Sequence, residues 1–296
     1  MEATQKIAEF IVGLEYSQIP SPVIEMAKTA ITDCIGVTIA GFGDEIGHIL
    51  TGWLRNEGGN PRCGVIGCGF KTSPSLAALV TGTAGHALDF DDANLAMHGH
   101  PSVPILPVIL ALGEDKKISG QKALEAYVVG FEVETKVGIA TAIPHYLSGW
   151  HTTGTLGALG AASAAAKILG LNVERTKMAL GIAASLASGL RQNFGSMTKP
   201  FHAGHAAWAG LIAAQLASAG FTADANIMET PLGFANVFCG PGKYKFEGAI
   251  DKLGNPYGLL ELGGLMIKKY PCCAEAHRAI DALLQLIEQK QISAVR

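Results

Sequence analysis

The sequence predicts an all-α fold class, in which one large multi-helical domain takes up most of the chain. Three observations support this prediction: apolar residues recur every three to four positions over long stretches, several stretches begin with typical helix-starting residues, and strand signals are scarce. The 296 residues are 49% hydrophobic, which is enough for a sizeable core in one or two domains.

The first expected helices begin at serine residues that can cap a helix N-terminus. Ser21 is followed by Pro22, which suits the first helical position, and the apolar residues after it keep the spacing of one helix face. Ser73 and Pro74 repeat this opening, and Ser119 starts a further periodic stretch. Each of these three stretches is therefore expected to form a helix with one apolar face.

Three further helices are expected in Ala- and Gly-rich stretches, near 152–169, 172–190 and 203–219. In the first of them, the glycines of "GTLGALG" are spaced three residues apart and fall on one side of the helix. Because glycine lowers helix propensity, close packing against neighbouring helices must compensate there.

Strand and boundary signals are limited to two regions. Residues 62–70, "RCGVIGCGF", are expected to contain a short extended piece. Strands and helices do not alternate along the sequence, so a Rossmann fold is not expected. Between 225 and 265, glycine, proline and aromatic residues predict loops with short helices. We therefore expect a helical domain over 1–265 and the start of a second unit over 266–296.

Composition argues against several classes of function. The formal net charge is −3 without any basic block, which disfavours a nucleic-acid partner. The six cysteines contain no CxxC pair, so neither a zinc framework nor a secreted disulfide scaffold is expected. The longest uncharged segment, 203–223, owes its hydrophobicity mainly to alanine and is interpreted as a buried helix, with no membrane span.

Charge content and the N-terminal residues give two more expectations. Charged residues make up 16% of the chain, below the roughly 25% typical of soluble domains, which favours an oligomer with covered surface. The first residues carry two acids and no signal-peptide pattern, so a cytoplasmic location is expected.

Four polar clusters each lie in a loop that leads into an expected helix. The densest, "HALDFDDANLAMHGHPSVP" at 86–104, holds three Asp and three His. The others are "SGWHTTGTLG", "GSMTKPFHAGHAAWAG" and "IKKYPCCAEAHRAI". A helix N-terminus attracts anions, and nearby lysine and histidine strengthen that preference. If these helix starts converge, they form a pocket for a small polyanion such as a di- or tricarboxylate.

Two prolines are expected to set the backbone of this pocket. Proline disfavours helical geometry in the residue before it. Pro101 should therefore keep His100 outside the following helix, and Pro200 should do the same for Lys199.

Other interpretations of the first cluster stay open. Asp89, Asp92, His98 and His100 are plausible ligands for Mn, Fe or Zn, as in a metal-dependent hydrolase or lyase. No HExxH motif is present, however, and the lysines near the other clusters would repel a metal ion. The acidic stretch is also compatible with a solvated helix end in a non-catalytic helical scaffold. Three imidazoles are interpreted as structural: His48, His86 and His145.

The clusters also resemble a known family. In this order, "HALDFDDANLAMHGHPSVPILP", "GWHTTGTLGALGAASAAAKILGL", "SGLRQNFGSMTKPFHAGHAAWAGL" and "KKYPCCAEAHRAIDAL" resemble the MmgE/PrpD family, which includes 2-methylcitrate dehydratase, cis-aconitate decarboxylase and iminodisuccinate epimerase. The resemblance implies a helical main domain and a smaller α/β lid domain, of which only the start would be present here. It also implies a homodimer that needs no cofactor and has its site between the two domains.

The clusters and the resemblance together assign roles to single residues. The expected catalytic residues are His100, His151, Asp89 and Lys199, and the expected substrate-binding residues are Lys268, Asp92 and Thr152. Cys273 and Ala93 stand where decarboxylases of the family carry His and Thr, which weighs against that one reaction.

The predicted function is that of a carbon–oxygen lyase (a hydro-lyase of the dehydratase type) acting on a di- or tricarboxylate such as 2-methylcitrate. A decarboxylase or an epimerase of the same family is the alternative, since all three reactions make or protonate a carbanion beside a carboxylate. Lys199 and Lys268 would stabilise the resulting dianion electrostatically. His100 and His151 would act as base and acid in either order, and Asp89 would orient an imidazole.

Overall fold

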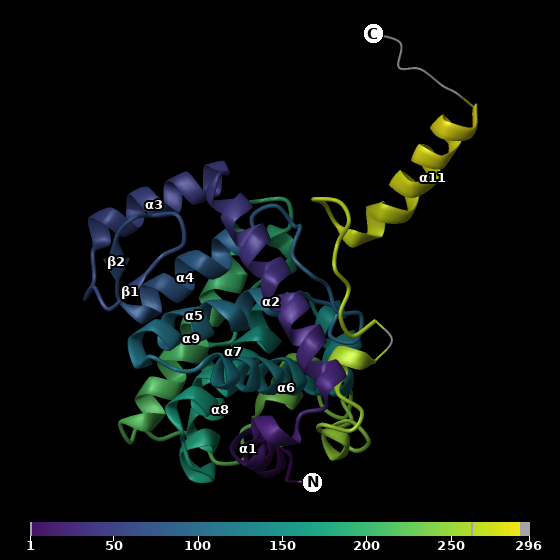
Figure 1. Cartoon of the computed structure of the whole chain (residues 1–296). Coiled ribbons are helices and arrows are strands. Elements are labelled where there is room, and N and C mark those ends of the chain that lie inside the picture. Colours follow the sequence, from purple (N-terminus) through teal and green to yellow (C-terminus); the bar gives the residue numbers. More distant parts are fainter. Residues whose placement is uncertain (1, 262, 291–296) are drawn as a thin grey trace.

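The computed structural model describes residues 2–261 and 263–290, and in this part of the chain it is built almost entirely from helices (Figure 1). The α-helices are α1 (Ala3–Gly13), α2 (Ser21–Phe42), α3 (Glu45–Glu57), α4 (Pro74–Gly85), α5 (Ser102–Lys116), α6 (Gly120–Leu147), α7 (Thr152–Leu169), α8 (Val173–Leu186), α9 (Thr198–Ser218), α10 (Phe234–Cys239) and α11 (Ala274–Lys290). Strands β1 (Cys63–Gly64) and β2 (Lys71–Thr72) pair antiparallel, which confirms the short extended piece expected there. The all-α fold class is confirmed.

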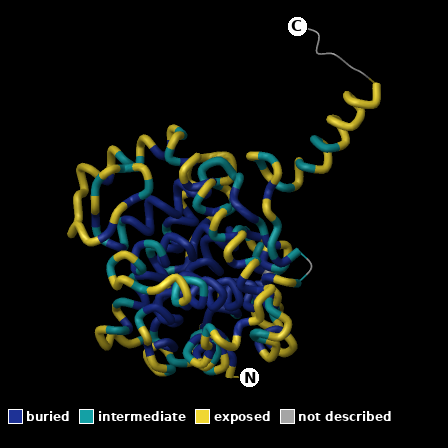
Figure 2. Tube along the Cα trace, in the orientation of Figure 1, coloured by how far each residue is buried: buried dark blue, intermediate teal, exposed yellow. Residues whose placement is uncertain are grey.

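Helix α7 forms the centre of the core. All residues from Thr152 to Ile168 are buried, and α7 contacts α5, α6, α8 and α9. Figure 2 shows the same pattern, with the buried trace concentrated in the middle of the molecule. Because the helix is covered on every side, the polar residues at its N-terminus are also held inside the protein.

The glycines of α7 allow its neighbours to come close, as the sequence predicted. A Cβ added at Gly154 would lie 2.3 Å from the carbonyl oxygen of Ser188. At Gly160 it would lie 2.6 Å from the carboxylate of Glu134, on α6. Each glycine thus leaves space for a different segment packed against this buried helix. The close packing compensates for the low helix propensity of glycine.

Helices α4 and α9 cross with similarly close contact. A Cβ at Gly204 of α9 would lie 2.1 Å from both the Leu79 carbonyl oxygen and the Thr83 hydroxyl of α4. Gly204→Ala is therefore expected to lower the free energy of unfolding by about 1–3 kcal/mol, the usual cost of overpacking. Urea denaturation measures this change. Gly36→Ala, on the exposed side of α2 with nothing within 4 Å, is the control and should be neutral or stabilising. Equal effects of the two variants would contradict the packing argument.

Two boundaries near the polar clusters differ from the sequence prediction. Helix α9 begins at Thr198, so Lys199 lies in its first turn instead of the preceding loop. Pro200 is tolerated there because the N–H groups of a first turn have no intrahelical partner. Helix α4 ends at Gly85, so Asp89 lies in a bend, where its φ of 48° is left-handed, and the interpretation of the acidic stretch as a solvated helix end is wrong.

The segment interpreted as a buried helix is confirmed in that role. Most residues of α9 are buried between α4, α7 and α8. Among the described residues, no helix combines the length and the apolar character needed to cross a membrane.

The segment after residue 265 has two parts. Met266 pairs with Ala93 through two backbone hydrogen bonds of 3.0 and 2.9 Å, so the chain returns to the helical body at this point. Helix α11 then extends away from that body (Figure 1), and none of its residues is buried. A domain boundary at 265 and 266 stays a prediction.

Candidate active site

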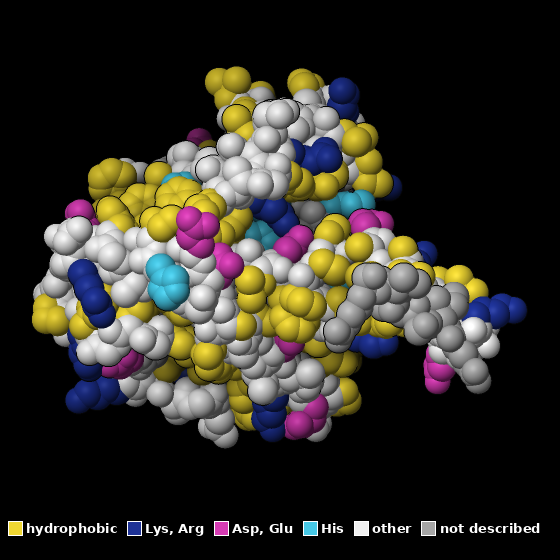
Figure 3. Space-filling view, turned by 90° about the horizontal axis from the view of Figure 1, so that it is seen from above, with side chains coloured by type: hydrophobic (Ala, Val, Ile, Leu, Met, Phe, Trp, Pro, Cys, Tyr) yellow, Lys and Arg dark blue, Asp and Glu magenta, His cyan; other side chains and the backbone are white. Residues whose placement is uncertain are grey.

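One cavity of about 650 Å³ collects polar residues from all four predicted clusters or their direct neighbours. Its lining includes His86, Asp89, His98, His100, His151 and Lys199, together with Cys273 from the last cluster. Apolar side chains, among them Leu95, Phe194, Met197 and Met266, form another part of the wall. Figure 3 shows basic, acidic and imidazole side chains gathered in a hollow on the upper face of the molecule. The predicted convergence of distant helix starts is therefore present.

The loop that carries His100 is fastened to the N-terminus of α7. The backbone N–H of His100 donates to the Thr153 hydroxyl at 3.0 Å, and the Thr152 hydroxyl donates to the carbonyl oxygen of His98. A Cβ at Gly99 would lie 2.9 Å from the Thr152 hydroxyl, so only glycine fits between loop and helix. This fastening places His100 in the same cavity as His151, which directly precedes α7.

Asp89 is the point at which two lysines meet. Its carboxylate lies 3.0 Å from the Lys199 ammonium and 2.8 Å from the Lys268 ammonium, and Nε2 of His100 is 3.6 Å away. Burial alone would raise the pKa of Asp89, but His100, Lys199 and Lys268 together hold that pKa below its ordinary value. Asp89 therefore anchors the lysines as an ionised carboxylate, in addition to its predicted contact with an imidazole.

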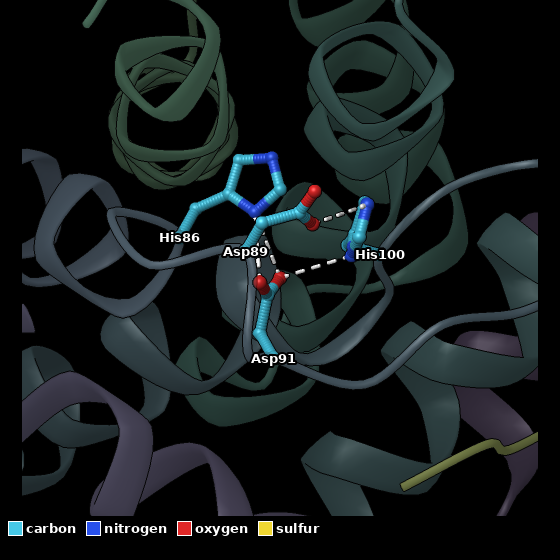
Figure 4. A group of neighbouring side chains, drawn as sticks. All are labelled: His86, Asp89, Asp91 and His100. Atoms are coloured by element: carbon cyan, nitrogen blue, oxygen red, sulfur yellow. Dashed lines mark hydrogen bonds and ion pairs between the residues drawn. The ribbon is translucent and has the colours of Figure 1, made fainter. Parts of the chain in front are cut away.

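Asp91 and His86 form a second, fully buried contact beside Asp89 (Figure 4). Nδ1 of His86 lies 2.9 Å from both carboxylate oxygens of Asp91, and Nδ1 of His100 lies 3.2 Å from one of them. Burial would raise the pKa of Asp91, but the two imidazoles lower it well below its ordinary value. Burial lowers the pKa of His86 to about 4, so its ring is neutral near pH 7.

His151 is held in a pocket of aromatic rings. Its pKa is lowered well below the ordinary value by burial first, and then by His86, His100, His202 and Lys199. Its Nδ1 lies 3.1 Å from Nδ1 of His202, so one of these two rings donates a hydrogen bond to the other. A neutral imidazole at neutral pH can accept a proton, which suits the role predicted for His151.

Sequence reasoning missed three of these residues. His86, which the sequence analysis interprets as structural, lines the cavity. Asp91 and His202 on α9, for which no role is predicted, each contact an imidazole of the site. The available signal was local, because His86 and Asp91 belong to the same polar stretch as Asp89 and His100. His202 likewise belongs to the third polar cluster, but its contact with His151 joins residues 51 positions apart, and no local pattern indicates that contact.

Two residues predicted to bind substrate are directed elsewhere. The Asp92 carboxylate accepts hydrogen bonds from the Ser102 hydroxyl at 2.6 Å and from its backbone N–H at 3.3 Å, and it is absent from the cavity wall. Burial raises the pKa of Asp92 to about 7. The Thr152 hydroxyl is bound to the carbonyl oxygen of His98. Both side chains therefore hold the loop that carries His100. Lys268 does not line the cavity, and its ammonium group donates a hydrogen bond to the carboxylate of Asp89, which does.

A metal centre at this position is less compatible with the charges than an anion site. Within the described ranges, His86, Asp89, Asp91 and His100 have ligand atoms within 4.8 Å of one another, so the set shares only Asp89 and His100 with the one predicted from sequence. Both carboxylates, however, already have partners: Asp89 contacts two ammonium groups, and Asp91 contacts two imidazoles. A divalent cation at Asp89 would lie beside two like charges.

Comparisons with known proteins agree with the family resemblance. The model of the MmgE/PrpD N-terminal domain matches residues 5–247. Cis-aconitate decarboxylase from Mus musculus is 33% identical over 290 residues, which cover 94% of this chain and 57% of that protein. Similar matches are cis-aconitate decarboxylases from Homo sapiens (31% identical, 94% and 58% covered) and Aspergillus terreus (32%, 96% and 60%). The chain thus spans less than two thirds of the length of these relatives.

Proposed function

This chain belongs to the MmgE/PrpD family, and from that premise we propose that it catalyses a lyase reaction on a small di- or tricarboxylate, through a carbanion next to a carboxylate group. The observation that carries the proposal is the meeting of His100, His151, Lys199 and Asp89 in one cavity. A lysine beside two imidazoles is a suitable set for binding a carboxylate and moving a proton next to it.

Lys199 is the residue that we expect to bind a substrate carboxylate. Its side chain is 16% exposed, it lines the cavity, and it lies in the first turn of α9, where the helix dipole also favours negative charge. Asp89 occupies one of the three ammonium donors, which leaves capacity for a ligand. As the carbanion forms, its charge spreads onto the neighbouring carboxylate, and the ammonium group stabilises that developing charge.

The two imidazoles are placed for proton transfer. Nδ1 of His100 faces acceptors, namely the Asp91 carboxylate and the carbonyl oxygen of Asp92 at 2.9 Å, so Nε2 is the nitrogen available for chemistry. His151 is buried against Phe194 and is neutral near pH 7. In a dehydration, one ring would remove the proton and the other would protonate the departing hydroxyl group. We propose both as acid–base groups without assigning the order.

Two reactions remain candidates within this proposal. Dehydration of a hydroxy-tricarboxylate such as 2-methylcitrate is the reaction that the sequence favoured, and it uses both imidazoles. Decarboxylation of cis-aconitate is favoured by the names of the relatives. In that reaction the carbanion forms by loss of CO₂, and one imidazole would reprotonate it. Ala93 and Cys273, the two departures from the decarboxylase pattern, both line the cavity, so they are in a position to affect this choice.

The experiment is an NMR assay with each substrate class in turn. We expect either the loss of water from 2-methylcitrate or the loss of CO₂ from cis-aconitate, and the product spectrum distinguishes the two. Turnover should persist after treatment with a chelator, because the proposed steps use only side chains. Absence of both turnover and tricarboxylate binding would contradict the proposal, and loss of activity with the chelator would favour a metal-dependent mechanism. Homodimer formation stays a prediction.

A further inference from the structure

We propose that Asp91 is a shared positioning residue, whose single buried carboxylate holds both His86 and His100 in the tautomer that carries hydrogen on Nδ1. This inference rests on the proposed function, because it explains how His100 would present Nε2 to a substrate. The inference adds Asp91 to the residues of the site, as a side chain that touches no ligand and acts through two imidazoles.

The buried carboxylate of Asp91 contacts two imidazoles. Asp91 is fully buried, and both of its oxygens lie 2.9 Å from Nδ1 of His86, while one lies 3.2 Å from Nδ1 of His100. The two rings are neighbours, with centroids 4.4 Å apart. Figure 4 shows the carboxylate of Asp91 facing both rings from one side.

The tautomer follows from what a carboxylate can do. An ionised carboxylate only accepts hydrogen bonds, so each nitrogen that contacts it must carry the hydrogen. Asp91 is ionised because the two imidazoles lower its pKa well below the ordinary value. His100 has a second acceptor on the same side, the carbonyl oxygen of Asp92. In both rings the proton therefore belongs on Nδ1, and Nε2 carries the free electron pair unless the ring is charged.

Neither Nε2 atom has an acceptor within hydrogen-bond distance among the described residues. The Asp89 carboxylate lies 3.6 Å from Nε2 of His100, which is beyond a hydrogen bond. Nε2 of His86 is buried and has no hydrogen-bond partner in the described part of the chain, although the residue lines the cavity. Leaving a buried acceptor unpaired costs free energy, so the Asp91 contact must outweigh that cost to keep His86 in this tautomer.

The test is NMR of the imidazole nitrogens in the full 296-residue chain labelled with ¹⁵N. In the wild type without ligand, both His86 and His100 are expected to show hydrogen on Nδ1 and a bare Nε2. Finding either ring with hydrogen only on Nε2 would overturn the proposal without any variant. Signals are assigned by their loss in His86→Gln and His100→Gln.

Asp91→Asn tests the shared role. The asparagine NH₂ group donates where a carboxylate oxygen accepted, so a hydrogen on Nδ1 is no longer favoured in the ring that faces it and is expected to move to Nε2. We expect at least one tautomer to change and kcat to fall by about 100-fold, within the range that proton transfer contributes, with a much smaller change in KM. Unchanged tautomers with wild-type kcat would overturn the proposal. Asp91→Glu keeps a carboxylate and is expected to recover part of the lost rate.

Glu134→Gln is the matched control. Glu134 is also fully buried, and burial raises its pKa well above the ordinary value, which favours the neutral acid that glutamine imitates. It does not line the cavity, and we expect wild-type tautomers and kcat. A shift of the His86 and His100 signals in this control would show that any loss of a buried acid disturbs them. Failure of tricarboxylate turnover in the wild type would instead refute the proposed function and leave the tautomer result standing.

Discussion

His151→Gln is expected to abolish the exchange of hydrogen with solvent at the carbon next to the substrate carboxylate. His151 lines the cavity in a neutral state and is one of the two imidazoles placed to take up or return that proton. Glutamine keeps a polar side chain of similar reach but has no basic nitrogen. The rate should fall by about 10²–10⁴-fold, the usual contribution of a positioned acid or base. The measurement is the loss of the substrate ¹H signal in D₂O, followed by NMR.

The control for this variant is His145→Gln. His145 is a buried imidazole on α6 that contacts Thr155 and Phe238 and does not line the cavity. Exchange in this control should match the wild type once its stability has been checked by circular dichroism. Wild-type exchange in His151→Gln would remove His151 from the mechanism and leave His100 as the acid–base group.

Lys199→Ala is expected to weaken tricarboxylate binding by about 10- to 100-fold, while the fold is retained. The magnitude corresponds to the loss of one hydrogen bond to a charged group, about 1.5–3 kcal/mol. Removal of the ammonium group also leaves the Asp89 carboxylate, 3.0 Å away, with less positive charge around it, so the cavity becomes less favourable for an anion. Isothermal titration calorimetry with citrate measures the change.

Lys269→Ala serves as the matched control for Lys199→Ala. Lys269 carries the same charge, but it is exposed, pairs with Asp281 at 2.9 Å and does not line the cavity. Its removal should leave citrate affinity unchanged, which separates a local contact from an effect of net charge. Equal affinity in wild type and Lys199→Ala would exclude Lys199 as an anion ligand and weaken the case for a polycarboxylate substrate.

The fold could be predicted largely because its signals are local. Ser73 precedes α4, and the Ser119 side chain accepts a hydrogen bond from the backbone of Lys122 at the start of α6, as their positions in the sequence indicated. The predicted start of α9, near residue 203, is wrong by several residues, because the helix begins at Thr198. Proline at the third helical position is compatible with a helix, and sequence alone does not show which side of Pro200 the first turn lies on.

The site could be predicted only as a set of clusters. That His100, His151 and Lys199 share a cavity depends on how α5, α7 and α9 pack, which no local pattern determines. Asp91 and Asp92 illustrate the limit: the two are adjacent, yet one contacts two imidazoles and the other contacts Ser102. Their directions follow from an irregular turn with a left-handed residue, and such a turn has no periodicity to interpret.

The most direct test of the account is a crystal structure of the chain with a bound tricarboxylate such as citrate. The central claim is that helix starts far apart in the sequence form one anion-binding cavity. It predicts a carboxylate within hydrogen-bond distance of Nζ of Lys199, and the ligand in contact with the rings of His100 and His151. A ligand bound at another surface, or an empty cavity in crystals grown at a citrate concentration that saturates binding in solution, would contradict it.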